Sequence, residues 1–180
     1  MKKTIFILIL AAIIINGCNK NDNDKTSGEN SLNSELILSG QTYSIQGFSF
    51  ESGSVILYNP ASSTSIPDIF ALPDTDPQNN EVTAYLDTEN PFESFALAGT
   101  FPTSGEALDF YNNYKEVKVS TYVSFAKPVL ENQVWVFKTR NNKYAKMLIM
   151  KVNTSIKNQE PYAEVTFKWA YQPDGSTIFP

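Results

Sequence analysis

The sequence predicts a mainly β fold, with antiparallel sheets in a single domain and one short α-helix at about residues 104–114. Two observations support this prediction. Short segments rich in Ile, Val, Tyr and Phe recur between turn-forming residues, as expected of antiparallel strands joined by tight turns. The last such segment, residues 161–172, alternates apolar with polar residues at the two-residue period of a strand with one buried face.

Several strands are expected before the C-terminal third of the chain, at residues 35–38, 42–50, 54–58, 81–86 and 115–125. Ser39-Gly40 and Ser52-Gly53 separate the first three, and tight turns favour these residue types. In the final strand, the side chains expected to point inward are Ala163, Val165, Phe167, Trp169 and Tyr171. Those expected to point outward are Glu164, Thr166 and Lys168.

Residues 104–114 have helical rather than strand periodicity. Ser104 can cap the first turn, and Glu106 and Asp109 favour the positive end of a helix dipole. The apolar residues at near-helical spacing are Leu108, Phe110 and Tyr111. We therefore expect one short helix here.

Residues 133–140 and 143–152 form the clearest predicted hairpin, because Asn141-Asn142 between them tolerates the positive φ of a two-residue turn. Such a turn would put on one face Trp135, Phe137, Tyr144, Lys146, Leu148 and Met150. The other face would carry Val134, Val136, Ala145, Met147 and Ile149. Since both faces are largely apolar, we expect this hairpin to be central in the fold.

Lysines interleave with aromatic residues in both C-terminal segments. Lys146 is expected near Trp135 and Phe137. Lys168 adjoins Trp169. A cation–π pair explains such a pattern, and a platform for a carbohydrate or another flat ligand is the alternative.

The N-terminus has the pattern of a secretory signal. Lys2 and Lys3 precede an unbroken apolar run over residues 5–15. A membrane-spanning helix needs about 20 residues, so this run is too short to be one. Cys18 follows Gly17 just after the run and resembles the lipobox cysteine of bacterial lipoproteins, which is diacylated and becomes the new N-terminus after cleavage.

The chain is expected to have three parts: a signal peptide at 1–17, lipidated Cys18 with a flexible tether at 18–34, and a β-rich domain at 35–180. Residues 19–34 are nearly all polar and cannot bury enough apolar surface to offset the entropy of ordering. Asn19 stands where lipoproteins retained in the inner membrane carry aspartate. We therefore expect a lipid-anchored protein of the outer membrane, on its periplasmic or cell-surface side. Cys18 is the only cysteine, which excludes a disulfide framework.

Charge is unevenly distributed. Residues 26–114 contain twelve carboxylates and no lysine or arginine, whereas residues 115–180 contain nine lysines and Arg140 against five acids. Loss of Lys2 and Lys3 with the signal would change the net charge from −5 to −7, which argues against nucleic acid as a partner. We expect the two halves to interleave so that acids and lysines pair across strands. An acidic loop face over residues 68–93 is the alternative.

The chain contains no histidine. Ser–His–Asp and Cys–His catalysis, His-ligated zinc and bis-histidine haem are therefore excluded. Catalysis would require a carboxylate pair of glycosidase type, and we predict that the protein is not an enzyme.

Residues 74–81 are a candidate calcium site. The oxygen-bearing side chains are those of Asp74, Asp76, Asn79 and Glu81. Calcium takes about six to eight oxygen ligands, often from one loop. The segment lacks the glycine of an EF-hand loop, and Pro77 fixes the backbone where such a loop bends. A polar turn between strands is the alternative.

The segments GFSFESGSVI, VWVFKTR, KYAKMLI and VTFKWAY resemble the HmuY family of haem-binding lipoproteins from Bacteroidota; they span residues 47–56, 134–140, 143–149 and 165–171. The resemblance implies an all-β, membrane-tethered binding protein. It also implies that the protein captures haem and passes it to an outer-membrane receptor, of the TonB-dependent type.

The haem-ligand positions of the family are not retained. The family holds haem between two histidines, or in some members methionines, upstream of the hairpin. Here no methionine occurs between Met1 and Met147. Met147 and Met150 are three apart, so on a strand they point to opposite faces and cannot both reach one iron. Haem is thus implied by the resemblance only, with Tyr122 or Tyr144 as the remaining ligand types.

We therefore expect a membrane-tethered, non-enzymatic ligand-binding lipoprotein of HmuY-like type that captures haem or another nutrient at the outer membrane. The alternatives are a calcium-stabilised surface interaction protein that uses residues 74–81, and a small hydrolase that uses two carboxylates.

Overall fold

A computed structural model describes residues 26–79 and 81–179, and these residues form a mainly β fold, as predicted. The strands in chain order are β1 (Ser27–Asn33), β2 (Ile37–Ser39), β3 (Thr42–Ser49), β4 (Ser54–Tyr58), β5 (Ile69–Thr75), β6 (Val82–Asp87), β7 (Phe95–Thr100), β8 (Gln133–Lys138), β9 (Tyr144–Lys157) and β10 (Glu160–Gln172). One helix, α1 (Ser104–Asn113), lies between β7 and β8.

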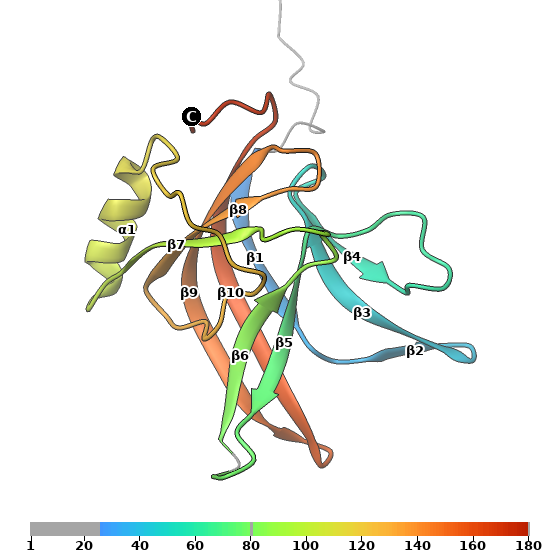
Figure 1. Ribbon diagram of the computed structural model, residues 1–180. Helices are drawn as coiled ribbons and strands as arrows, with labels where there is room; N and C mark the ends of the chain where they lie inside the picture. The colour runs from blue at the N-terminus through green and yellow to red at the C-terminus, as the bar shows by residue number, and fades with distance from the viewer. Residues whose placement is uncertain (1–25, 80, 180) are drawn as a thin grey trace, which may run out of the picture.

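The strands build two antiparallel sheets that pack against each other (Figure 1). The first sheet has the order β1-β10-β9-β8-β7. The second has the order β2-β3-β5-β6, with β4 paired to β3. Helix α1 covers the face of the first sheet that points away from the second, so the molecule has three layers.

Aromatic rings fill the core between the sheets. The ring of Phe48 on β3 lies 5.2 Å from that of Phe50 and 5.2 Å from that of Trp169, between centroids. Trp169 is fully buried, and its Nε1 donates to Asn30 Oδ1 at 2.8 Å. Burial of each large apolar side chain stabilises the folded state by about 1.5–3 kcal/mol. This cluster therefore holds β10 against β1 and β3 at once.

The helix prediction is confirmed, with a different cap. Thr103 is the N-cap: its hydroxyl accepts the Glu106 N–H at 3.3 Å and donates to the Glu106 carboxylate at 3.0 Å. The Thr103 side chain thus satisfies one of the free backbone N–H groups of the first helical turn. Ser104, expected as the cap, is instead the first helical residue, because Thr103 is the residue with extended backbone angles.

The alternation predicted for the last strand is confirmed in β10. The inward residues are all buried: Ala163, Val165, Phe167, Trp169 and Tyr171. The outward residues Glu164, Thr166 and Lys168 are partly exposed. Strict two-residue alternation over a long segment therefore predicted both the strand and its buried face.

The β-rich domain begins earlier than predicted. The prediction of a flexible tether over residues 18–34 is therefore wrong for residues 27–33. Residues 27–33 form β1, which pairs with β10 from Ser27↔Ala170 to Asn33↔Glu164. Leu32 is fully buried. This polar segment is ordered because β10 supplies partners for its backbone N–H and C=O groups. The predicted signal peptide and Cys18 lie outside the described residues.

The β8–β9 hairpin exists, but its register is one residue away from the prediction. Thr139 N–H donates to the Lys143 carbonyl at 2.9 Å, so the connection runs from Thr139 to Lys143 and is not a two-residue turn. The positive φ, 57°, falls on Asn142. A one-residue shift moves every β9 side chain to the other face. The core face therefore holds Trp135, Phe137, Ala145, Met147 and Ile149.

Lys146 consequently does not lie beside Trp135 and Phe137, contrary to prediction. It is buried on the helix side of the sheet, where its Nζ donates to the carbonyls of Tyr111 and Tyr114 at 2.8 Å each. Its ammonium lies 4.6 Å from the centroid of the Tyr111 ring. The cation–π pair thus exists, but with an aromatic residue of α1.

Residues 115–125, predicted as a strand, form none of the named strands. The segment makes only isolated bridges, Glu116 to Ile178 and Val123 to Phe95. Strands β5 and β7 are not apparent from the sequence pattern. Pro73 and Asp74 interrupt the apolar run of β5, and the ladder of β7 shifts between Leu97 and Gly99.

Each salt bridge within residues 26–79 and 81–179 joins an acid from the acidic half to a lysine from the basic half. The pairs are Lys127–Asp74 at 2.9 Å, Lys143–Glu51 at 3.6 Å, Lys157–Glu35 at 3.1 Å and Lys168–Glu29 at 3.1 Å. The predicted pairing across strands is confirmed for Glu29 and Lys168, which face each other in β1 and β10, but the other three bridges involve residues outside the strands. Strands of the two halves interleave in the first sheet only. Exposed pairs contribute only about 0–1 kcal/mol each, so these bridges balance charge locally and do not dominate stability. Within the described part of the chain, no helix is long and apolar enough to cross a membrane.

Candidate functional site

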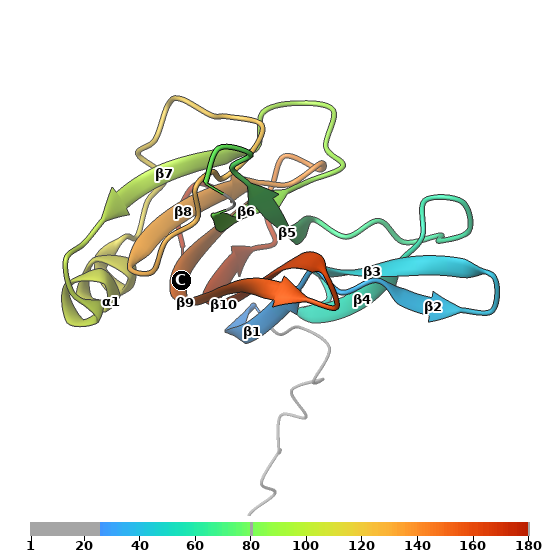
Figure 2. The ribbon, with the colours of Figure 1, turned by 90° about the horizontal axis from the view of Figure 1, so that it is seen from below.

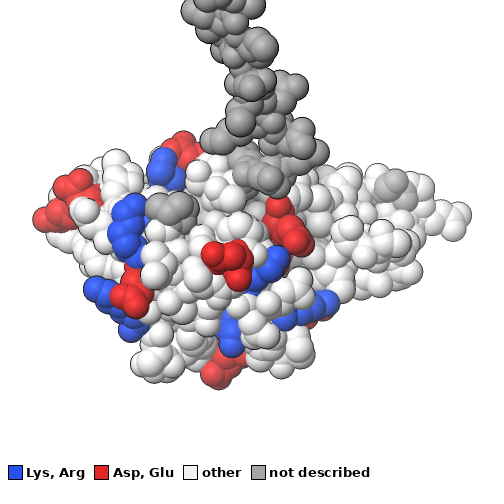
Figure 3. Space-filling view, turned by 90° about the horizontal axis from the view of Figure 1, so that it is seen from above, with Lys and Arg blue, Asp and Glu red and all other residues white. Residues whose placement is uncertain are grey.

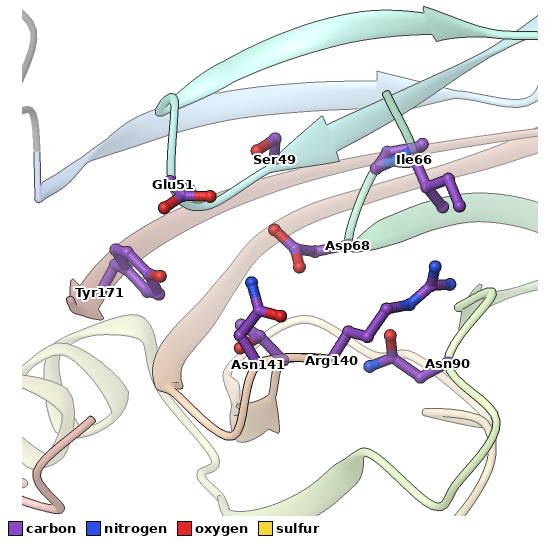
Figure 4. Close-up of a pocket in the computed structure, with 10 residues that line it drawn as sticks. Ser49, Glu51, Ile66, Asp68, Asn90, Arg140, Asn141 and Tyr171 are labelled. Carbon is purple, nitrogen blue, oxygen red and sulfur yellow. The ribbon is translucent and has the colours of Figure 1, made fainter. Parts of the chain in front are cut away.

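A small polar cavity of about 110 Å³ lies where loops of both sheets meet (Figure 4). The lining residues are Ser49, Glu51, Ile66, Pro67, Asp68, Asn90, Thr139, Arg140, Asn141 and Tyr171. They come from the β3–β4 turn, the segments before β5 and β7, the β8–β9 turn and the end of β10. Loops held by rigid sheets are common sites of ligand binding.

Asp68 occupies the middle of this cavity in Figure 4. Its Oδ2 accepts the N–H of Phe50 at 2.8 Å, which ties the start of β5 to the end of β3. Among the described residues this is the only hydrogen bond to its carboxylate, and Asp68 takes part in none of the salt bridges. Because a carboxylate has about four acceptor positions, Asp68 has capacity left for a ligand.

The environment of Asp68 disfavours its charged form. Burial raises its pKa from 3.8 to about 6; the Phe50 N–H lowers the pKa, Glu51 raises it and Arg140 lowers it. Burial has the largest effect of the four. A buried carboxyl with a strongly shifted pKa inside a cleft is typical of functional sites.

Arg140 supplies positive charge at the other side of the cavity. It is the only arginine of the chain, and its Nη2 donates to the Glu89 carbonyl at 2.7 Å. In Figure 4 the guanidinium lies beside Asn90, away from Glu51 and Tyr171. A guanidinium has about five N–H donors, so further donors remain for an anionic or carbonyl group.

Glu51 and Tyr171 form the side of the cavity opposite Arg140. Glu51 Oε1 lies 3.6 Å from Lys143 Nζ. Burial, assisted by the carboxylates of Glu51 and Asp68, raises the pKa of Tyr171 to about 12, so the phenol stays protonated at neutral pH. The cavity therefore has the Glu51 carboxylate and a neutral hydroxyl at one side, Asp68 in the middle and a guanidinium at the other side.

Three side chains of the candidate calcium site already have a protein partner. Asp74 pairs with Lys127. Asp76 Oδ1 accepts the Gln78 N–H and Asn79 Oδ1 accepts the Glu81 N–H, each at 2.8 Å. Within residues 26–79 and 81–179, no three His, Cys, Asp or Glu side chains gather as metal ligands. The calcium site stays a prediction. The hydrogen bonds within the segment are those of the alternative, a polar turn between strands.

The residues considered as haem ligands are not brought together on one cavity. Met147 is fully buried in the core, whereas Met150 is 41% exposed. Tyr122 and Tyr144 each pack against a separate cluster on the helix side of the first sheet, formed by Tyr114, Val136 and Phe179. Burial, with smaller effects of Tyr144 and Tyr114, raises the pKa of Tyr122 to about 12. Because metal ligands bind deprotonated, this shift opposes iron ligation by Tyr122. The residues present do not fit a haem held by two axial ligands.

The aromatic platform suggested by the tryptophans is absent at both positions. Trp135 and Trp169 are buried and belong to the core. Trp135 Nε1 donates to Gln133 Oε1 at 2.9 Å, which satisfies its polar atom without solvent. These rings therefore stabilise the fold and are not exposed to a flat ligand.

Sequence analysis did not single out the cavity. Asp68 is one of the twelve acids in residues 26–114, and nothing in the sequence distinguishes it from the others. Strand β5, which positions Asp68, is not apparent from the hydrophobic pattern. One signal was available: Arg140, the single arginine, adjoins a hairpin turn. The acidic loop face over residues 68–93, which was the alternative interpretation of the charge distribution, does not form one site, because Asp68 lines the cavity while Asp74 pairs with Lys127.

The sequence matches no protein-family model, and no curated protein sequence matches it. The geometry of the cavity is therefore the main indication of function.

Proposed function

We propose that this protein is a membrane-tethered, non-enzymatic binding protein whose ligand occupies the cavity around Asp68. The observation that carries the proposal is the half-buried Asp68 carboxylate, which accepts one backbone N–H and lies in no salt bridge among the described residues. Burying an ionised group without a charged partner costs stability. A ligand that brings a positive charge would recover that cost.

The lining indicates the class of ligand. An ammonium group suits Asp68, and a carboxylate or carbonyl suits the Arg140 guanidinium. The lining also contains the hydroxyl of Tyr171 and the side-chain amide of Asn141, which can form hydrogen bonds with a ligand. The volume of about 110 Å³ is below the range of about 300–1,000 Å³ of sites for drug-sized ligands. The ligand is therefore a small amino compound with an acceptor group, the class to which amino acids belong.

Haem is not the ligand that we propose, although the resemblance to the HmuY family implies it. The chain has no histidine, and Met147 and Met150 do not share a cavity. The family's tethered binding role remains part of the proposal, and only the ligand differs.

The proposed tether is the acylated Cys18, at the outer membrane. Two or three acyl chains hold a protein stably on a bilayer, where one gives only reversible binding. A carrier held there would pass its ligand to a TonB-dependent receptor, as the resemblance implies. Cys18→Ser should move the protein from the membrane to the soluble fraction. Retention of the variant on membranes after carbonate washing would contradict the anchor.

Calorimetric titration at pH 7.5 tests the binding site, with glycine, serine, ethanolamine and glucose as probes. Glycine and serine carry both charges and should bind at a 1:1 ratio. Ethanolamine lacks the carboxylate and should bind more weakly, and glucose should not bind. Asp68→Asn should lose the heat of binding.

Asp87→Asn is the matched control. Asp87 is a half-buried acid on β6 whose pKa burial also raises, but it does not line the cavity. This variant should bind glycine as the parent does. Equal binding by the Asp68→Asn variant, or binding of glucose alone, would contradict the proposed site.

A hydrolase with two carboxylates is the second candidate. It is favoured by one observation: Glu51 and Asp68 line one cavity, and the Asp68 pKa of about 6 suits a general acid. Turnover of nitrophenyl glycosides that both Asp68→Asn and Glu51→Gln abolish would favour the hydrolase. Ligand binding without turnover favours the carrier.

A further inference from the structure

Strands β2, β3 and β4 project from the body of the molecule (Figure 2), and we define the wing as residues 36–50 and 52–67. Its exposed large apolar side chains are Leu36, Leu38, Tyr43, Val55, Leu57 and Ile66. By the strand registers, Leu38 and Tyr43 lie on one face of this part of the sheet, and Val55 and Leu57 lie on the other.

Glu51, in the turn between β3 and β4, is the only charged residue between Leu36 and Pro67. In Figure 3 the projecting end at the right shows neither red nor blue. Residues 26–179 together carry seventeen acids against ten basic residues, a net charge of −7. Two copies that approach through their charged faces repel each other. The wing is the surface through which a second copy meets no like charge.

The outer edge of β4 is open. The fold covers the edges of β6 and β7: Leu86 and Ala126 exchange hydrogen bonds at 3.1 Å each, and Phe95 and Val123 at 3.0 and 2.7 Å. Within the described residues, β4 pairs with β3 alone. An uncovered edge that carries apolar side chains is a template for another strand.

We propose that β4 pairs with β4 of a second copy, antiparallel about a two-fold axis at Ile56. In this register Ile56 faces its own counterpart, and Val55 of each copy faces Leu57 of the other. Val55 and Leu57 lie two residues apart and so share a face of β4. They are 37% and 53% exposed in the single chain. The register therefore covers both side chains and joins the two second sheets into one.

Several features favour a second copy over a different partner. The edge is self-complementary, since the same two apolar residues meet twice across the axis. Isologous two-fold contacts are the commonest form of homo-oligomer. The proposal is independent of the Asp68 cavity, because Val55, Ile56 and Leu57 are not among its lining residues.

Disulfide cross-linking tests the register. In the full chain carrying Cys18→Ser and Ile56→Cys, the introduced thiol is the only one. Directly opposed residues of antiparallel strands have Cα atoms about 4.5–5.5 Å apart, which a disulfide can span. Mild oxidation should convert most of the protein to a covalent dimer. Adding Leu57→Lys should abolish that dimer, because each lysine would then face Val55 of the other copy and the two like charges would be diagonal neighbours across the axis.

Leu38→Cys is the matched control for Ile56→Cys. Leu38 is also an apolar residue of the wing, but it lies on β2 and not on the proposed β4 interface. It should yield little dimer. Light scattering adds a test that needs no cysteine: the Cys18→Ser chain should have twice the mass of the same chain with Leu57→Lys, and the variant should still unfold in one cooperative transition. A monomeric parent, cross-linking of Leu38→Cys equal to that of Ile56→Cys, or cross-linking only to another protein would overturn the proposal.

Discussion

Asp68 and Arg140 line one cavity although they belong to different sheets: Asp68 directly precedes β5, and Arg140 lies in the turn between β8 and β9. The Arg140 charge partly offsets the effect of burial on the Asp68 pKa. The two sheets must therefore be packed together before the cavity exists. A carboxylate and a guanidinium held in this way can recognise the two charged ends of one small molecule.

Asp68→Asn should stabilise the protein at pH 7.5 by about 1–3 kcal/mol, because it removes a charge that is partly desolvated. The Asp68 pKa is raised from 3.8 to about 6. The stabilising contribution of protonated Asp68 is complete below pH 3.8 and is lost as the pH rises through about 6. The variant should thus exceed the parent at pH 7.5 and match it near pH 4. Urea denaturation at both pH values measures this.

The control for this measurement is Asp174→Asn. Hydrogen bonds, chiefly from the Ser176 N–H, lower the pKa of Asp174, so its removal should not stabilise the protein at pH 7.5. A pH-independent difference between Asp68→Asn and the parent would contradict the buried charge.

Lys146→Met should destabilise the domain, because the carbonyls of Tyr111 and Tyr114 lose their donor. Each unsatisfied buried group costs about 1–3 kcal/mol. Burial, and then Lys115, lower the pKa of Lys146 from 10.5 to about 8. Its stabilising contribution is complete above pH 10.5 and is lost as the pH falls through about 8, so the cost of the substitution should grow from pH 7 to pH 10. Thermal melts at several pH values measure this, with the exposed Lys151→Met as control.

Trp135→Ala should cost about 3–5 kcal/mol, as large aromatic truncations in cores do. Trp135 is buried between the sheets and pairs across the ladder with Met147. Leu97→Ala is the control, since Leu97 pairs with Trp135 on the other side but is exposed. It should cost about 1 kcal/mol or less. A Trp135→Ala variant that melts within a degree or two of the parent would contradict the core assignment.

Haemin should not bind as a six-coordinate low-spin complex, because the described residues provide no suitable ligand pair. Titration of haemin into the protein, followed by the visible spectrum, measures this. A sharp low-spin Soret band with resolved α and β bands at a 1:1 ratio would restore the haem function that the family resemblance implies.

The fold class could be predicted from local pattern. β10 alternates strictly, so its buried face follows from the sequence. Which β9 side chains face the core could not be predicted, because that depends on the length of the β8–β9 turn. Hydrogen bonds of Thr139, which is itself buried, set this length. β1 is polar and becomes a strand only because β10 lies beside it.

The cavity could not be predicted for a related reason. Its residues are far apart in the chain and meet only when both sheets are formed, and the pKa of Asp68 is shifted mainly by burial, which no local pattern reveals. The absence of histidine, by contrast, limited the ligand chemistry directly from the sequence.

The most direct test of the central claim is the titration of the Asp68 carboxyl carbon by ¹³C NMR, in the free protein and with saturating glycine. In the free protein the pKa should be about 6. Bound glycine places an ammonium beside the carboxylate and favours its charged form, so the pKa should fall toward its ordinary value of 3.8. A pKa that glycine leaves unchanged, with no shift of the Asp68 resonance, would contradict ligand binding at this cavity.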